Sequence, residues 1–238
     1  MEHHPIFWVD LIPVLKELPA HTVHATVVMA LVIGFALLAR RQLSAARAAG
    51  NELVPDETLT LRNMAELFVG GMTSLSDGVL GTSGRAYVPL FGSFFLFILV
   101  ANLMGLVPGF SPPTSDFNIT FGLGVASFLA YNAIGINSQG LVNYCKHFVG
   151  PIWWLGFLMV PLELIDNLVR PVSLSLRLFG NMTGDHLVLE IFTDLTKLVV
   201  PVVFYFLGAF VSLIQAFVFT LLTIIYVSLA VGHGGEGH

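Results

Sequence analysis

Charged side chains are scarce in this sequence, and their scarcity decides the class of protein. Lys, Arg, Asp and Glu make up 11% of the 238 residues, whereas a soluble domain carries about 25%. Hydrophobic residues make up 55%, and the mean hydropathy is +0.84. So few charges could not cover a surface that faces water on all sides. We therefore predict an all-α integral membrane protein.

Other features are scarce or absent as well. Cys145 is the single cysteine, which excludes an internal disulfide and any metal site built from several cysteines. The ten Lys and Arg residues give no basic footprint for nucleic acid. The opening MEHHPIFWVD lacks the basic segment of a signal peptide, so we expect the first hydrophobic run to be retained as a span. We expect no cofactor, no metal and no nucleic-acid partner.

Long apolar runs predict about five membrane-crossing helices within one membrane domain, residues 1–238. The first span is expected at residues 22–39, and residues 87–136 are expected to form a helical hairpin that crosses twice. Between them, residues 59–83 mix apolar and polar side chains at helical spacing. This pattern predicts an amphipathic helix on the cytoplasmic surface of the membrane.

Residues 151–231 are expected to form the last two helices, which carry the candidate ion path. As one helix, the final apolar run would be about 51 Å long, against a hydrocarbon core of ~30 Å. We therefore expect this pair to be long and steeply tilted. Arg40, Arg41 and Arg47 follow the first span, and basic residues stay cytoplasmic. The N-terminus is then outside and, after five crossings, the C-terminus is cytoplasmic.

The first of these two helices carries a stripe of polar residues in otherwise apolar sequence. Steps of three and four residues keep side chains on one face of a helix. The stripe consists of Glu163, Asp166, Arg170, Ser173, Arg177, Asn181 and Asp185. Asp185 lies further round the helix than the other members.

Arg177 lies near the middle of this segment, with leucines on both sides. An arginine there costs at least ~2.5–3.5 kcal/mol on the insertion scale, and its guanidinium cannot shed its charge. Snorkelling toward a helix end is the structural alternative. Asp166 and Asp185 lie two to three turns away, and Asp166 is expected to pair with Arg170 instead. We infer that the counter-charge comes from another chain or moves.

Three further polar features border this stripe. His186 and Glu190 lie one turn apart. They form either a solvated helix end or a titratable pair in a water-filled inlet. A zinc site would need a further ligand, and the HExxH motif is absent. Gln215 belongs to a second stripe and either makes an interhelical hydrogen bond or faces Arg177. Asn102 suits helix packing and channel lining equally. The second stripe consists of Gly208, Ser212, Gln215, Phe219, Thr223 and Tyr226.

Four sequence segments carry a resemblance to a known family. They are LSLRLFGNM, QAFVFTLLTIIYVSLA, ANLMGLVPGFSPPTSDFNIT and PLELIDNLVRPVSLSL. Over about residues 87–231 the chain resembles subunit a of the membrane sector of F-type ATP synthases. The resemblance implies a proton-translocating stator subunit beside a rotating c-ring, whose carboxylates load and unload protons through two aqueous half-channels. It also implies b subunits of the peripheral stalk as partners, and a bacterial cell membrane as the location.

The resemblance also implies roles for individual residues. Arg177 matches the essential arginine that attracts the ionised ring carboxylate and separates the half-channels. Residues matching the outer half-channel or its interface are Asn102, Asn181, His186 and Gln215. Glu163 resembles the acid of the exit side. Some members have an ionisable residue where this chain has Gly208, and some have an acid where it has Gly105. We hypothesise that Glu190 supplies the missing carboxyl.

Two other functions remain open at this point. A stand-alone ion channel or secondary transporter would conduct ions as purified protein, whereas the ring mechanism predicts little coupled flux without the ring. A membrane-embedded hydrolase built on His186 and Glu190 lacks a nucleophile motif. The choice between H+ and Na+ lies mainly with the ring carboxylate, on another chain.

Overall fold

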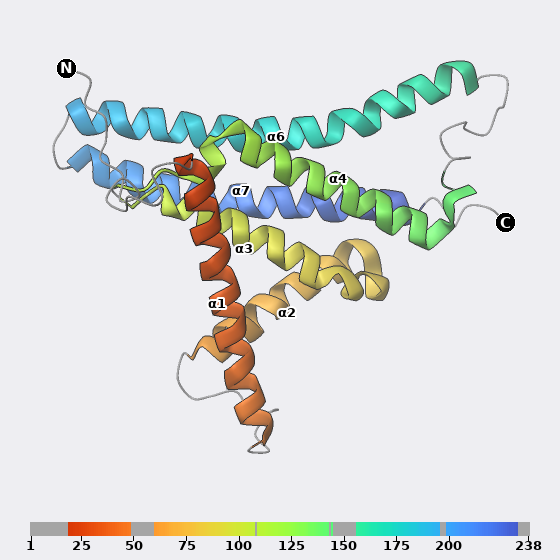
Figure 1. Cartoon of the computed structure of the whole chain (residues 1–238), viewed down its shortest axis with the longest axis horizontal. Coiled ribbons are helices and arrows are strands. Elements are labelled where there is room, and N and C mark those ends of the chain that lie inside the picture. The colour runs from red at the N-terminus through yellow and green to blue at the C-terminus, as the bar shows by residue number, and fades with distance from the viewer. Residues whose placement is uncertain are drawn as a thin grey trace.

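Every regular element of the described chain is a helix, as the composition predicts. The computed structural model describes residues 19–48, 60–107, 109–142, 144, 156–195 and 199–232. The helices, in chain order, are α1 (Ala20–Ala48), α2 (Leu61–Leu80), the 3-10 helix η3 (Gly81–Tyr87), α3 (Val88–Met104), the 3-10 helix η4 (Pro113–Ser115), α4 (Phe117–Gln139), α6 (Gly156–Leu195) and α7 (Val199–Gly232) (Figure 1). The all-α prediction is confirmed.

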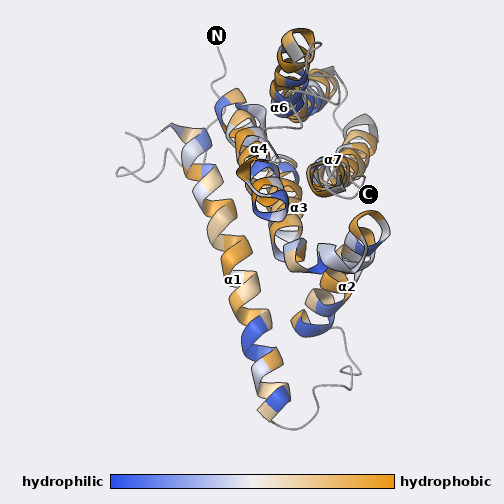
Figure 2. Ribbon diagram, turned by 90° about the vertical axis from the view of Figure 1, so that its right-hand side faces the viewer, coloured by the Kyte–Doolittle hydropathy of each residue, from blue (hydrophilic) through white to orange (hydrophobic). Residues whose placement is uncertain are grey.

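Four stretches of the described chain are long and apolar enough to cross a membrane. They are residues 20–48, 61–104, 117–139 and 202–232. Helix α6 is not among them, although it runs for 40 residues. Hydrophobic residues dominate the middle of α1, and hydrophilic ones gather toward its lower end (Figure 2). The protein is therefore a multi-pass membrane protein.

Helices α6 and α7 run antiparallel and lie across α1. Figure 1 shows α1 upright with α6 and α7 nearly horizontal, and Figure 2 shows the same pair almost end-on. Helix α7 is continuous over 34 residues, so the final apolar run forms one long helix as expected. Helix α6 contains Pro161 and Pro171 and bends along its length in Figure 1. This arrangement fits a steep tilt of α6 and α7, provided that α1 stands near the membrane normal.

Helix α2 lies beside the C-terminal part of α1. Its N-cap is Thr60, whose hydroxyl accepts a hydrogen bond from the backbone N–H of Asn63, and it ends at Gly81, where φ is +65°. Gln42 of α1 accepts a hydrogen bond of 2.9 Å from the backbone N–H of Arg62. The structure thus ends this helix at residue 80 and continues it as η3, close to the predicted range of 59–83.

The core joins α3 to helices from both ends of the chain. One cluster packs Phe94 and Ile98 of α3 against Leu178 of α6 and Phe219 of α7, all at most 7% exposed. Val28 of α1 packs against the other side of α3. Helix α3 is therefore the central helix of the bundle, and it fixes where α6 and α7 lie.

Small and polar residues allow α4 to approach its neighbours closely. A Cβ placed on Gly124 would lie 2.1 Å from the Ser175 hydroxyl and 2.6 Å from the Pro171 carbonyl oxygen of α6. On the side facing α7, the hydroxyls of Ser127 and Thr223 form a buried hydrogen bond of 3.0 Å. In lipid, helices associate through contacts of this kind because apolar side chains gain little by leaving the acyl chains.

Candidate functional site

The middle of the polar stripe of α6 lies on the outward face of the bundle. Ser173, Arg177 and Asn181 are exposed, while Leu174 and Leu178 on the opposite face are at most 1% exposed. Of the other stripe members, Asp166 is exposed, and Glu163, Arg170 and Asp185 are partly buried. The middle of the stripe is therefore open to a neighbouring molecule, whereas Arg170 packs against Tyr226 and Asp185 lines a cavity of this chain.

Arg177 has no hydrogen bond or ion pair within the described ranges. Its neighbour Leu176 is 52% exposed, so the guanidinium emerges from an apolar helix surface. Arg170 differs, as its spacing predicted. Its Nη2 lies 2.5 Å from the carboxylate of Asp166, and its guanidinium lies 5.4 Å from the ring centroid of Tyr226. Arg170 is thus paired with an acid of its own helix, whereas Arg177 has no such partner in the described chain.

The structure brings Asn181, one turn after Arg177 on α6, together with Gln215 of α7. The side-chain amide of Asn181 donates a hydrogen bond of 2.7 Å to Oε1 of Gln215. Gln215 is 2% exposed, and its Nε2 has no partner in the described chain. The contact is an interhelical hydrogen bond that joins the two polar stripes, as the first interpretation of Gln215 predicted, whereas its approach to Arg177 stays a prediction. The members of the α7 stripe are buried, apart from the partly buried Tyr226.

A small cavity opens between α3, α6 and α7, one turn from this contact toward the α6–α7 connection. Its water-accessible volume is about 20 Å³, which is enough for one water molecule. Its polar lining consists of Asn102, Asp185, His186 and Ser212, with Gly208 beside them. Asn102 is 1% exposed and accepts a hydrogen bond of 2.6 Å from the hydroxyl of Thr114. Asn102 therefore both packs and lines a cavity.

The imidazole of His186 fills the space beside Gly105. A Cβ on Gly105 would lie 2.4 Å from Nε2 of His186 and 2.8 Å from Pro112. A side chain at residue 105 would therefore have to displace the histidine ring or the loop. The side chain of Glu190 is outside the described part of the chain, so its suggested role stays a prediction.

A second polar group joins α4 to α6 in the half of the bundle near the α4 C-terminus. The hydroxyl of Tyr131 donates to the backbone carbonyl of Asn167 at 3.2 Å and also contacts its side-chain oxygen. Tyr131 and Asn167 are both buried, whereas Glu163, one turn earlier on α6, is partly buried. This pair was not predicted, because a lone tyrosine and a lone asparagine on different helices leave no local pattern in the sequence.

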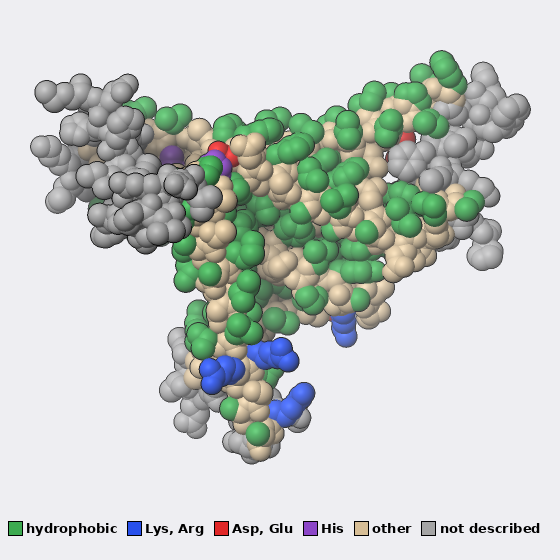
Figure 3. Space-filling model, viewed as in Figure 1, with side chains coloured by type: hydrophobic (Ala, Val, Ile, Leu, Met, Phe, Trp, Pro, Cys, Tyr) green, Lys and Arg blue, Asp and Glu red, His purple; other side chains and the backbone are tan. Residues whose placement is uncertain are grey.

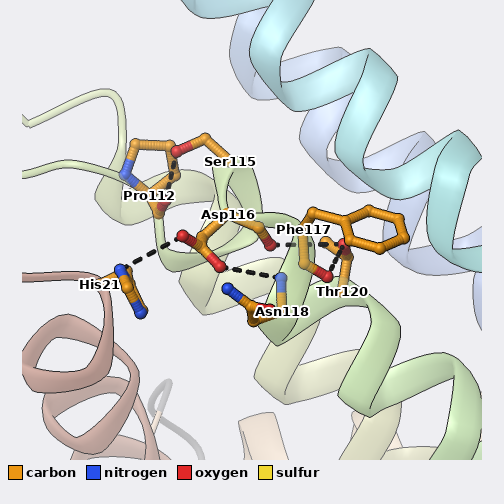
Figure 4. Close-up of polar contacts among 7 residues, drawn as sticks. All are labelled: His21, Pro112, Ser115, Asp116, Phe117, Asn118 and Thr120. Carbon is orange, nitrogen blue, oxygen red and sulfur yellow. Dashed lines mark hydrogen bonds and ion pairs between the residues drawn. The ribbon is translucent and has the colours of Figure 1, made fainter. Parts of the chain in front are cut away.

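Another unpredicted contact anchors α1 to the loop before α4. Nδ1 of His21 lies 3.2 Å from a carboxylate oxygen of Asp116, which also caps α4 by accepting from the backbone N–H of Asn118 at 2.8 Å (Figure 4). The Asp-X-Asn spacing ahead of a helix could have indicated the cap. The partner on α1 required the tertiary structure.

Known proteins share similarity with this sequence over most of its length. A family model described as "ATP synthase A chain" matches residues 22–228. The chain belongs to the ATP synthase A chain family. It is 42% identical over 226 residues to ATP synthase subunit a of Bdellovibrio bacteriovorus, covering 95% of this chain and 97% of that protein. It is 47% identical over 167 residues to ATP synthase subunit a of Geobacter sulfurreducens, covering 70% and 72%.

A third relative extends the same result. ATP synthase subunit a 1 of Syntrophotalea carbinolica is 44% identical over 208 residues, which cover 87% of this chain and 84% of that protein. Membership of the family makes the chain the a subunit of the Fo sector of a rotary ATP synthase, a membrane component that takes part in proton transport and ATP synthesis. The resemblance drawn from the motifs around Arg177 is confirmed.

Proposed function

We propose that helices α6 and α7 pass protons between two aqueous half-channels and the carboxylates of a rotating c-ring. The observation that supports this proposal best is the state of Arg177, an exposed cation on an apolar face with no partner in the described chain. A permanent charge in hydrocarbon needs an anion or water beside it. A ring carboxylate that passes this face in turn would supply the anion.

The physical logic of the cycle follows from the charge on Arg177. A protonated carboxylic acid can enter lipid, whereas a carboxylate cannot do so at reasonable cost. A nearby guanidinium favours the ionised form of the ring acid and drives its release of a proton. A guanidinium carries a permanent positive charge, so Arg177 also blocks direct proton transfer between the half-channels.

We assign the inlet to the cavity between α3, α6 and α7. Its polar lining leads, within one helical turn on α6 and on α7, to the Asn181–Gln215 hydrogen bond and from there to Arg177. On the other side of Arg177, Ser173, Asp166 and Glu163 continue the stripe toward the N-terminal end of α6. We assign these three residues to the exit half-channel.

The distribution of basic residues supports an orientation. Figure 3 shows Lys and Arg side chains gathered over the lower end of α1, away from α6. The basic residues of this end are Arg40, Arg41 and Arg47. Because positive charges remain cytoplasmic, we propose that this end faces the cytoplasm of a bacterial cell, with the N-terminus outside and the C-terminus inside. The c-ring and the stalk b subunits are the proposed partners.

Substitution of Arg177 by alanine tests the function. In inverted membrane vesicles, ATP synthesis driven by respiration should fall to background in Arg177→Ala, while the amount of assembled complex on an immunoblot stays unchanged. Arg85→Ala is the matched control, since Arg85 pairs with Asp77 outside the proposed path and should leave synthesis intact. Wild-type synthesis in Arg177→Ala would refute the proposal.

Disulfide crosslinking tests the ring contact separately. With Cys145 replaced by serine, single cysteines at Ser173 and Asn181 should form disulfides with cysteines placed along the outer helix of the ring subunit. A cysteine at the buried Leu178 should not. Equal crosslinking at Leu178 and Asn181, or none at the exposed positions, would show that the stripe does not face the ring.

A further inference from the structure

The C-terminal half of α1 carries a groove that leads from apolar to charged side chains. Its volume is about 540 Å³, and it is lined by Gly34, Leu37, Leu38, Arg40, Arg41 and Ser44. With a rise of about 1.5 Å per residue, it extends about 15 Å along α1. Its apolar end lies toward the hydrophobic middle of α1, and its polar end lies where hydrophilic residues gather in Figure 2. In a membrane crossed by α1, the groove therefore runs from the hydrocarbon into the headgroup region.

The apolar end of the groove is open because Gly34 has no side chain. A Cβ at Gly34 would meet nothing within 4 Å, so the floor of the groove there is helix backbone. Leu37 and Leu38 form the walls and are 54% and 50% exposed. The described chain thus leaves an uncovered apolar surface beside the backbone. An aliphatic chain that packs there gains van der Waals contacts along its length.

The polar end of the groove carries two cations without a counter-ion. The side chains of Arg40 and Arg41 make no hydrogen bond or ion pair within the ranges that the structure describes. Helix α1 itself contains no acidic residue. The acids of the neighbouring helix α2 are Glu66 and Asp77, and they are paired with other arginines at 2.6 and 2.7 Å. The charge at this end of the groove therefore attracts an anion from outside the described chain.

The groove opens away from the rest of the bundle. Arg41 lies about 160° round the helix from Ala39. Ala39 and Val28, on the face opposite the groove, are 8% and 0% exposed, whereas Arg40 and Arg41 are exposed. Figure 3 shows basic side chains on the surface at this end of α1. An occupant therefore reaches the groove from the surrounding membrane.

We propose that this groove binds a phospholipid with a net negative charge, whose phosphate lies at Arg40 and Arg41. A guanidinium binds phosphate oxygens through two parallel N–H···O bonds. The apolar end receives the first part of an acyl chain, which a free phosphate ion lacks. A zwitterionic headgroup would bring a further cation beside the two arginines, so an anionic headgroup binds more tightly. This inference goes beyond the proposed function and does not depend on it.

Photocrosslinking of the purified ATP synthase complex in nanodiscs tests the site. The nanodiscs contain phosphatidylcholine and phosphatidylglycerol in equal parts, with a trace of phosphatidylglycerol that carries a photoreactive group near its phosphate. Mass spectrometry should locate the adducts on the residues that line the groove. A phosphatidylcholine probe with the same photoreactive group should give about fivefold fewer adducts there. Excess inorganic phosphate should leave the phosphatidylglycerol adducts in place.

Three variants separate a specific site from diffuse electrostatic attraction. Gly34→Leu fills the apolar end without removing a charge, and its Cβ has room. It should lower the adduct yield about tenfold, the effect of losing roughly two methylene contacts. Arg41→Gln should lower the yield about tenfold or more, because a charged hydrogen bond is lost. Arg47→Gln is the matched control, since it removes the same charge from the same end of α1 outside the groove, and its effect should be smaller.

Several results would overturn the proposal. Absence of lipid adducts in the groove of the unaltered complex would mean that another subunit covers it. Loss of the adducts in excess inorganic phosphate would mean that the groove takes a free anion. Equal losses in Arg41→Gln and Arg47→Gln, or an unchanged yield in Gly34→Leu, would show diffuse attraction only. If Arg41→Gln assembles poorly, Arg40→Gln takes its place.

Discussion

Replacing Gly124 by alanine tests whether the contact between α4 and α6 sets the position of the polar stripe. The added Cβ would lie 2.1 Å from the Ser175 hydroxyl and 2.6 Å from the Pro171 carbonyl oxygen, and the second of these atoms belongs to the backbone. Overpacking costs about 1–3 kcal/mol, and a backbone contact that cannot rotate away favours the upper value. Alanine is about 1 kcal/mol more favourable than glycine inside a helix, and this gain offsets part of the loss. The net loss is then about 2 kcal/mol.

The assay is the thermal stability of the detergent-solubilised complex, followed by the temperature at which this subunit leaves the soluble fraction. For a chain of this size, 2 kcal/mol corresponds to a fall in apparent Tm of about 4–8 °C. Gly122→Ala is the matched control, because it lies on the same helix and its added Cβ meets nothing within 4 Å. It should be neutral or slightly stabilising.

A double variant separates the two clashes at Gly124. Ser175→Ala removes the hydroxyl but leaves the Pro171 carbonyl in place, so it should recover only part of the lost stability. ATP-driven proton pumping should fall with Gly124→Ala, because α6 has to shift away from α4. If the Gly124→Ala and Gly122→Ala complexes have the same apparent Tm and Gly124→Ala pumps protons normally, the close approach of α4 and α6 is not what positions the stripe.

Two further variants test contacts within the site. A double-mutant cycle with Asn181→Leu and Gln215→Leu should give a coupling free energy of about 0.6 kcal/mol in thermal stability. This is the average for hydrogen bonds between membrane helices. Additive losses of stability would show that the two amides do not interact. Gly105→Ala should reduce passive proton conduction, because its Cβ displaces the His186 ring or Pro112; unchanged conduction with normal assembly would mean that this ring position is not needed.

Much of the fold followed from the sequence because it depends on local composition. Apolar runs and helical spacing predicted helices within 87–136, where the structure has α3 and α4, and within 59–83, where it has α2 and η3. The interfacial position of the second segment stays a prediction. The i,i+4 spacing predicted the pair between Asp166 and Arg170, because a helix alone brings such residues together. The spacing of the α7 stripe likewise predicted one face of a helix, and that face is buried.

Contacts between helices could not be predicted in this way. Tyr131 meets Asn167 across 36 positions, and Asn181 meets Gln215 across 34. The hypothesis that Glu190 supplies the missing carboxyl came from the resemblance to the family and stays a prediction, whereas the tertiary structure places Asp185 at the cavity beside Gly208. A helical wheel orders residues on one helix but does not say which face meets which neighbour.

The sequence by itself determined that this chain lies in a membrane, that it is helical, and that a fixed cation, Arg177, occurs on a polar stripe. These properties follow from the free energy of transferring individual side chains and from the period of one helix. Only the tertiary structure decided that Ser173, Arg177 and Asn181 of this stripe face outward. It also decided that Gln215 reaches Asn181 and that Asp185 shares a cavity with Asn102 and Ser212. The physical reason is that the close packing of separate helices fixes which of their faces meet.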